Sequence, residues 1–119
     1  MQIIFFSNDL LFSSRVEGAA SAAGHVVTAT SSIDRLIEGA AESDTQLILV
    51  DLSTPNIDIK DLVAKTRQGE SQAKIVAYGP HVLEPVLAAA RDAGCDAVLT
   101  RGQFDSQLPA IIGQFSQPT

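Results

Sequence analysis

The chain alternates between short apolar runs and segments whose apolar residues recur every three or four positions. Short runs of this kind are typical of strands, and their near-continuous apolar character is typical of parallel strands covered on both faces. Five runs occur, at residues 2–6, 26–30, 47–50, 74–78 and 97–100. We therefore predict five buried strands in one parallel sheet.

The segments between and after these runs have the spacing of amphipathic helices. They cover about residues 9–23, 32–42, 58–68, 84–94 and 106–115. Gly24 and Gly94 are placed to end the first and fourth helices. Ser31 or Ser32 can cap the second helix, and Pro109 must lie in the first turn of the fifth or kink it.

Five strands that alternate with five helices predict a doubly wound α/β sandwich, with helices on both faces of the sheet. The length of 119 residues suits one domain with its own core. We assign residues 1–116 to that domain and residues 117–119 to a tail. The sequence has no internal repeat, low-complexity tract or glycine-rich phosphate-binding loop.

Charge and cysteine content narrow the function classes. A net charge of -6 and a pI near 4.6 leave no basic stripe for phosphates, which argues against direct binding to nucleic acid. The only cysteine, Cys95, has no partner for an intramolecular disulfide, and the first apolar run lacks the basic flank of a signal peptide. No apolar stretch approaches the roughly 18 residues of a membrane helix. We expect a cytoplasmic protein that does not insert into a membrane.

Polar side chains follow several predicted strands, at the edge where α/β proteins bind ligands. In chain order the residues at these strand ends are Ser7, Asn8, Asp9, Asp51, Gly79 and Arg101, and all but Gly79 have a polar side chain. Because an unpaired buried charge is costly, Asp51 and Arg101 are expected to form an ion pair across this edge. Ser7 or Asn8 can add hydrogen bonds to it.

The segment LILVDLSTPNID, residues 47–58, resembles the third-strand motif of the receiver domains of two-component response regulators. Asp51 matches the phosphoacceptor of the family's D-x-x-M-P-x-M-D pattern, and Pro55 and Asp58 match its later positions. The spacing from the first loop to Gly24, and from Gly79 to the turn at 94–96, also equals that of the family. The resemblance implies a flavodoxin-like three-layer sandwich and a role in a two-component phosphorelay.

The acid pair of the family is missing from this sequence. In the family, two acidic residues end the first strand and hold a magnesium ion together with the phosphoacceptor. The matching positions here are Ser7 and Asn8, which carry no charge to offset the dehydration of magnesium. Asp9 lies one residue further on and is predicted to cap the first helix.

The positions that respond to phosphorylation in the family also differ. Gly79 stands where the family has a threonine or serine, and Arg101 stands where it has a lysine that reaches the phosphoryl oxygens. Val98 stands at the position of the aromatic residue that couples the site to the output face. Tyr78 is predicted to fill the space left by the missing hydroxyl side chain at position 79.

We therefore predict a degenerate, pseudo-receiver-like domain that is not an enzyme, needs no cofactor and acts by protein–protein interaction. The resemblance implies a partner surface on the fourth helix, fifth strand and fifth helix, at residues 83–91, 97–100 and 104–115. A histidine kinase partner and a homodimer both stay open.

Two alternatives remain from the sequence. A histidine kinase can phosphorylate Asp51, with Asn8, Asp9 and Asp51 forming a weaker magnesium site. The same edge can instead hold a small ligand or nucleotide, since doubly wound folds host many functions, although no loop cradles a phosphate.

Overall fold

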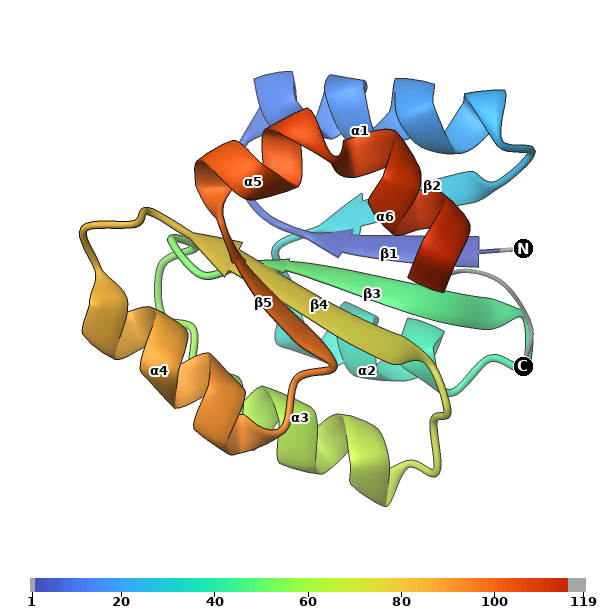
Figure 1. Cartoon of the computed structure of the whole chain (residues 1–119). Coiled ribbons are helices and arrows are strands. Elements are labelled where there is room, and N and C mark those ends of the chain that lie inside the picture. Colours follow the sequence, from blue (N-terminus) through green and yellow to red (C-terminus); the bar gives the residue numbers. More distant parts are fainter. Residues whose placement is uncertain (1, 116–119) are drawn as a thin grey trace.

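One parallel sheet organises the chain in the computed structural model, which describes residues 2–115 (Figure 1). The strand order is β2-β1-β3-β4-β5. The strands are β1 (Gln2–Phe6), β2 (Val26–Thr30), β3 (Thr45–Asp51), β4 (Lys74–Gly79) and β5 (Ala97–Thr100). The helices are α1 (Leu10–Ala22), α2 (Ile33–Ala40), α3 (Ile59–Gln68), α4 (Glu84–Ala93), α5 (Arg101–Ser106) and α6 (Leu108–Phe115).

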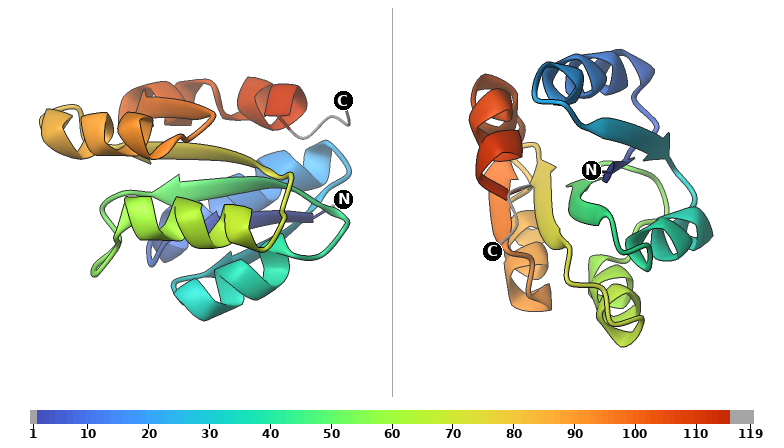
Figure 2. Two further views of the ribbon diagram at one scale, coloured as in Figure 1. Left: turned by 90° about the horizontal axis from the view of Figure 1, so that it is seen from below. Right: turned by 90° about the vertical axis from the view of Figure 1, so that its right-hand side faces the viewer.

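Helices cover the sheet on both faces and give two hydrophobic cores (Figures 1 and 2). One core joins α1, α5 and α6 to the sheet, with Phe5, Phe12 and Phe104 at its centre. The other joins α2, α3 and α4 to the opposite face, around Ile48 and Leu62. Alternate residues of the central strands enter opposite cores, which explains why these strands are apolar along their whole length. The predicted doubly wound sandwich is confirmed.

The strand predictions hold in position but not in burial. β1, β2 and β5 have the predicted bounds, while β3 and β4 extend beyond theirs. The prediction that all five runs are buried is wrong for β2 and for β5, because these strands form the two edges of the sheet, and the four residues of β5 are partly exposed. Val26 keeps 67% of its surface exposed, and Thr28 and Ala29 are exposed as well.

Local capping sets the ends of the helices. The sequence predicts the caps at Asp9 and Ser32 and the ends at Gly24 and Gly94, but not the cap at Asp58. The side chains of Asp9, Ser32 and Asp58 accept backbone N–H groups at the starts of α1, α2 and α3. Gly24 and Gly94 follow α1 and α4 with φ of 83° and 96°, in the left-handed region that favours glycine.

The single fifth helix of the prediction is two helices, so the described chain has six. Thr100 caps α5 through a reciprocal pair of hydrogen bonds with Gln103, which starts the helix directly after β5. Pro109 lacks an N–H to continue that helix, and its ring would clash with the carbonyl of Asp105. A new helix, α6, therefore begins at Leu108 and holds Pro109 in its first turn, as predicted.

The predicted tail at 117–119 and the domain end at 116 lie outside the described residues. Among the helices at 10–115, none has both the length and the apolar character that crossing a bilayer requires.

The ring of Phe104 is the main contact of α5 with the sheet. It is fully buried and stacks on Tyr78, with ring centroids 4.1 Å apart and ring planes 9° apart. Phe12 lies against the same pair, so three elements share this aromatic cluster.

Replacing Phe104 with alanine is expected to lower the free energy of unfolding by about 3–5 kcal/mol, because a large buried ring leaves a cavity. Urea denaturation followed by circular dichroism measures the change. Val82→Ala, at a side chain that is 73% exposed, serves as the control and should cost less than about 0.5 kcal/mol. A similar loss in both variants would contradict this packing.

Candidate functional site

The carboxyl ends of β1, β3 and β4 meet at one end of the sheet, as parallel strands require. Phe6 is in register with Val50, and Asp51 with Tyr78. This register brings Ser7, the residue after β1, beside Asp51, the last residue of β3. The edge predicted from the sequence is therefore formed by the pairing of the central strands.

Asp51 is the centre of this site and keeps only 2% of its surface exposed. Its Oδ2 accepts a hydrogen bond of 2.7 Å from the Ser7 hydroxyl. Its Oδ1 accepts the Ser53 hydroxyl at 2.6 Å and the Ser53 backbone N–H at 3.0 Å. Both carboxylate oxygens thus have donors from the chain itself. Of the two donors proposed for Asp51, Ser7 fills the role, while the Asn8 side chain is exposed.

The predicted ion pair between Asp51 and Arg101 is wrong. Arg101 lies in the first turn of α5, and its Nη2 is 3.1 Å from Oδ2 of Asp9. Its guanidinium also lies over the ring of Phe12, 4.9 Å from the centroid. The N-cap and the first turn of α1 supply both contacts, while the hydroxyls of Ser7 and Ser53 donate to Asp51.

Asp9 has two roles at the start of α1. Its Oδ1 accepts the Phe12 N–H, which confirms the predicted cap, and its Oδ2 meets Arg101. The Phe12 N–H first, and then the Arg101 guanidinium, hold the pKa of the Asp9 carboxyl below its usual value.

Comparisons with known proteins support the fold found above. No protein-family model matches the sequence, and no curated protein matches it. Solved structures match along nearly the whole chain. The receiver domain of the sensor histidine kinase PA1611 from Pseudomonas aeruginosa PAO1 has a TM-score of 0.80 at 18% identity, over 97% of this chain and 96% of that chain.

Two further receiver domains match equally broadly. A response regulator domain from Bermanella marisrubri has a TM-score of 0.80 at 20% identity, over 98% of both chains. The receiver domain of the response regulator TorR has a TM-score of 0.77 at 17% identity, over 96% of this chain and 98% of that chain. The chain has the receiver fold.

The donor set of this receiver-fold site does not fit a magnesium ion. Within residues 2–115, no group of three or more His, Cys, Asp or Glu side chains is placed to hold a metal. Asp51 already accepts hydrogen bonds on both oxygens, and Asp9 is held by Phe12 and Arg101. Magnesium needs several oxygen ligands, usually with carboxylate charge. The weak metal candidates Asn8 and Asp51 would supply one amide and one carboxylate that is already engaged.

Tyr78 and Gly79 occupy opposite faces of the receiver-fold sheet, so the prediction that the Tyr78 ring fills the space at position 79 is wrong. A Cβ at Gly79 would lie 3.3 Å from Cβ of Leu52 and 3.5 Å from Cδ2 of Leu87. Those two leucines fill the space instead. Strand alternation turns the Tyr78 ring to the other core, against Phe104.

The Tyr78 hydroxyl is buried at the site and has no hydrogen-bond partner among the described residues. Burial first, and then the nearby Asp51 carboxylate, raise the pKa of the phenol well above its usual value. The phenol therefore stays neutral beside the carboxylate throughout the physiological range.

Sequence reasoning missed Ser53 as a donor to Asp51. The local signal was present, because an aspartate side chain often accepts the backbone N–H two residues later in an Asx turn. Asp51 and Ser53 have this spacing, and the serine adds its hydroxyl.

Asp9→Asn is expected to reduce stability in a pH-dependent way, since asparagine keeps a cap acceptor but loses the charge that faces Arg101. A carboxyl with a lowered pKa stabilises the folded state above its unfolded pKa of about 3.9, and this contribution is lost as the pH falls through the folded value. The difference between wild type and variant should thus be full at neutral pH and shrink below about pH 4. Urea denaturation across this range measures it.

Arg101→Gln is the matched control for the comparison of wild type with Asp9→Asn, because it removes the cation that faces Asp9. In a double-mutant cycle, part of the Asp9→Asn effect should disappear once Arg101 is replaced. A difference between wild type and Asp9→Asn that is the same at neutral and acid pH would contradict the ionic contribution.

Proposed function

We propose that the chain is a receiver-like signalling domain in a two-component context, acting by protein–protein interaction and not as an enzyme. In this proposal the domain works in the cytoplasm without magnesium-dependent phosphorylation. The observation that carries the proposal is the hydrogen bonding of Asp51: both of its carboxylate oxygens accept hydrogen bonds, one from Ser7 and the other from Ser53.

Phosphoryl transfer to an aspartate needs a free carboxylate oxygen and cations that neutralise the developing charge. Attack by Asp51 would require breaking a short hydrogen bond at a carboxylate that is 2% exposed. The nearest strand-end cation, Arg101, is committed to Asp9. These contacts support a site in which Asp51 keeps its hydrogen bonds and does not attack a phosphoryl group.

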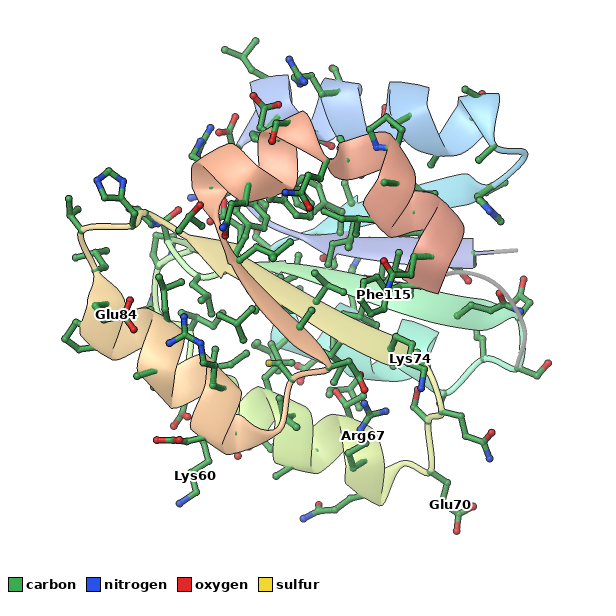
Figure 3. The ribbon with its side chains drawn as sticks, viewed as in Figure 1. Lys60, Arg67, Glu70, Lys74, Glu84 and Phe115 are labelled. Atoms are coloured by element: carbon green, nitrogen blue, oxygen red, sulfur yellow. The ribbon has the colours of Figure 1, made fainter. Side chains whose placement is uncertain are left out.

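The proposed partner surface combines α4, β5, α5 and α6, at the edge of the sheet formed by β5 (Figure 1). All four residues of β5 are partly exposed. Val82 and Leu83, just before α4, are 73% and 42% exposed, and Figure 3 shows Glu84 at the start of this helix. An exposed apolar corner beside a charged helix suits a protein partner.

The packing around Gly79 supports a proposed partner surface that keeps one conformation. Position 79 has no hydroxyl to move, and Leu52 and Leu87 fill the space around it. Val98, on β5, packs with the core under α4. In this proposal the domain presents the same face whatever the state of Asp51.

A phosphoacceptor role for Asp51 is the second candidate. It is favoured by the place of Asp51 at the end of β3, the position that matches the phosphoacceptor of the receiver family. The similar receiver domain of PA1611 has a magnesium ion coordinated in its active site cleft. Under this alternative, a histidine kinase is the partner and Asn8 and Asp9 assist the metal.

Titration with magnesium and then beryllofluoride should leave the amide resonances around Asp51 unchanged, and acetyl phosphate should add no phosphoryl mass. NMR and intact mass spectrometry provide the two measurements. Saturable shifts together with an added phosphoryl mass would establish the phosphoacceptor role instead.

The double variant Ser7→Asp/Asn8→Asp is the matched control for metal binding. It places two carboxylates beside Asp51, whose mutual repulsion a divalent cation can offset. Magnesium should therefore raise the melting temperature of this variant and leave that of the wild type unchanged. An equal response in both proteins would contradict the proposal.

A further inference from the structure

The edge of the sheet opposite β5 is formed by β2 and carries no charge. No Asp, Glu, Lys or Arg occurs from Gly18 to Ile33, the longest such stretch in the sequence. Within it, β2 has the sequence VVTAT, and its first residue, Val26, is 67% exposed. Figure 2 shows β2 as the outermost strand, with α1 packed on one face of the sheet.

This edge lacks the features by which proteins block edge-to-edge pairing. Such features are lysines, prolines, bulges or very short strands. β2 contains neither lysine nor proline, and its five residues pair with β1 in unbroken register from Val26 to Thr30. Its valines and threonines are the residue types that pair well across strands.

Within residues 2–115, the outer side of β2 presents a short row of backbone groups without a partner. The Thr30 carbonyl accepts the Ser7 N–H, so it points inward toward β1. Because the N–H and C=O of one residue point to the same side of a strand, and successive residues alternate, Val27 and Ala29 direct theirs outward. The preceding outward N–H, that of His25, is bonded to the Ala20 carbonyl. The open part of the edge is therefore centred on Thr28.

We propose that β2 pairs with β2 of a second copy of this chain, antiparallel and across a two-fold axis at Thr28. Two identical edges that hydrogen-bond to each other across a two-fold axis run antiparallel, because a parallel two-fold pair would set each residue against itself without the stagger that parallel pairing needs. With Val27 opposite Ala29 of the partner, both outward N–H groups and both outward carbonyls of each copy are hydrogen-bonded. Val26 then faces Thr30 of the second copy, a pair of β-branched side chains.

Charge favours this contact over others between two copies. Each copy carries a net charge of -6, so two copies repel, and the repulsion is smallest when the surface that joins them is itself uncharged. β2 meets this condition, and α1, which packs beside it, adds the small exposed residues Gly18, Ser21 and Ala22. The contact is small, so the dimer should be weak, and added salt should strengthen it by screening the repulsion.

Pairing through β2 leaves the proposed partner surface open, because β5 forms the other edge of the sheet. If that surface is used as proposed above, a dimer presents two copies of it and gains avidity for a partner with two sites. The dimer itself does not rest on the proposed function, and its test involves neither Asp51 nor α4.

Disulfide trapping of Thr28→Cys in a Cys95→Ala background tests the register. Thr28 faces its own symmetry mate in a non-hydrogen-bonded pair, where Cα atoms are about 4.5 Å apart, within the range of a disulfide. Mild oxidation should give a covalent dimer. Val26→Cys in the same background is the matched control, because its symmetry mate lies roughly 13 Å away along the strand. Val26→Cys/Thr30→Cys should form the dimer again.

Sedimentation velocity measures the dimer without a cross-link. Wild type and Thr28→Val should associate more as concentration rises, whereas Thr28→Lys, which places two ammonium groups face to face, should stay monomeric. In the wild type, hydrogen exchange at Val27 and Ala29 should slow with concentration. Absence of concentration-dependent association, equal trapping of Thr28→Cys and Val26→Cys, or a Thr28→Lys dimer of wild-type strength would each overturn the proposal.

Discussion

A buried carboxylate at the end of β3 is the constraint on which the candidate site depends. Asp51 is removed from water, and an ionised carboxylate in that position needs donors for its oxygens. Ser7 and Ser53 supply them from the two sides of the strand end, one by strand pairing and the other by a local turn. Two neutral hydroxyls and one backbone N–H are thus the hydrogen-bond donors to Asp51.

Because Ser7 and Ser53 supply the hydrogen bonds to Asp51, the other side chains of the site make structural contacts with one another. Arg101 joins the first turn of α5 to the first turn of α1 through Asp9 and the Phe12 ring. Tyr78 and Phe104 stack directly beneath, so the start of α5 is tied to the sheet by an aromatic contact and to α1 by an ionic one. Both ties favour a domain with one stable arrangement around the strand ends.

The two edges of the sheet differ in chemistry and suit different partners. The β5 edge lies beside α4, which follows the exposed apolar residues Val82 and Leu83 and carries an ion pair between Glu84 in its first turn and Arg91 in its last. The β2 edge has open backbone groups and no charge. In the proposals made above, the β5 edge recognises a different protein through side chains, and the β2 edge pairs with a second copy of this chain through backbone groups.

The sequence by itself determined the features that depend on neighbouring residues. Apolar runs located the strands, Asp9 and Ser32 marked helix starts, and the motif around residues 47–58 placed Asp51 at a strand end and indicated the receiver fold. The identities of Ser7 and Asn8 led to the prediction that the acid pair of the receiver family is missing. Capping, strand alternation and residue chemistry act over a few residues, so the sequence displays them directly.

Tertiary structure alone decided which distant side chains meet. Spacing along the chain placed Asp51 and Arg101 at the same edge, but the packing of α5 against α1 directed Arg101 to Asp9. Successive residues of β4 face opposite sides of the sheet, which follows from local strand geometry. The side chains that pack against these two faces, such as Leu52 and Phe104, come from other elements. The exposure of β2 likewise follows from the strand order, which an apolar run does not encode. Contacts between elements depend on the relative placement of whole helices and strands, and short sequence patterns carry no measure of that placement.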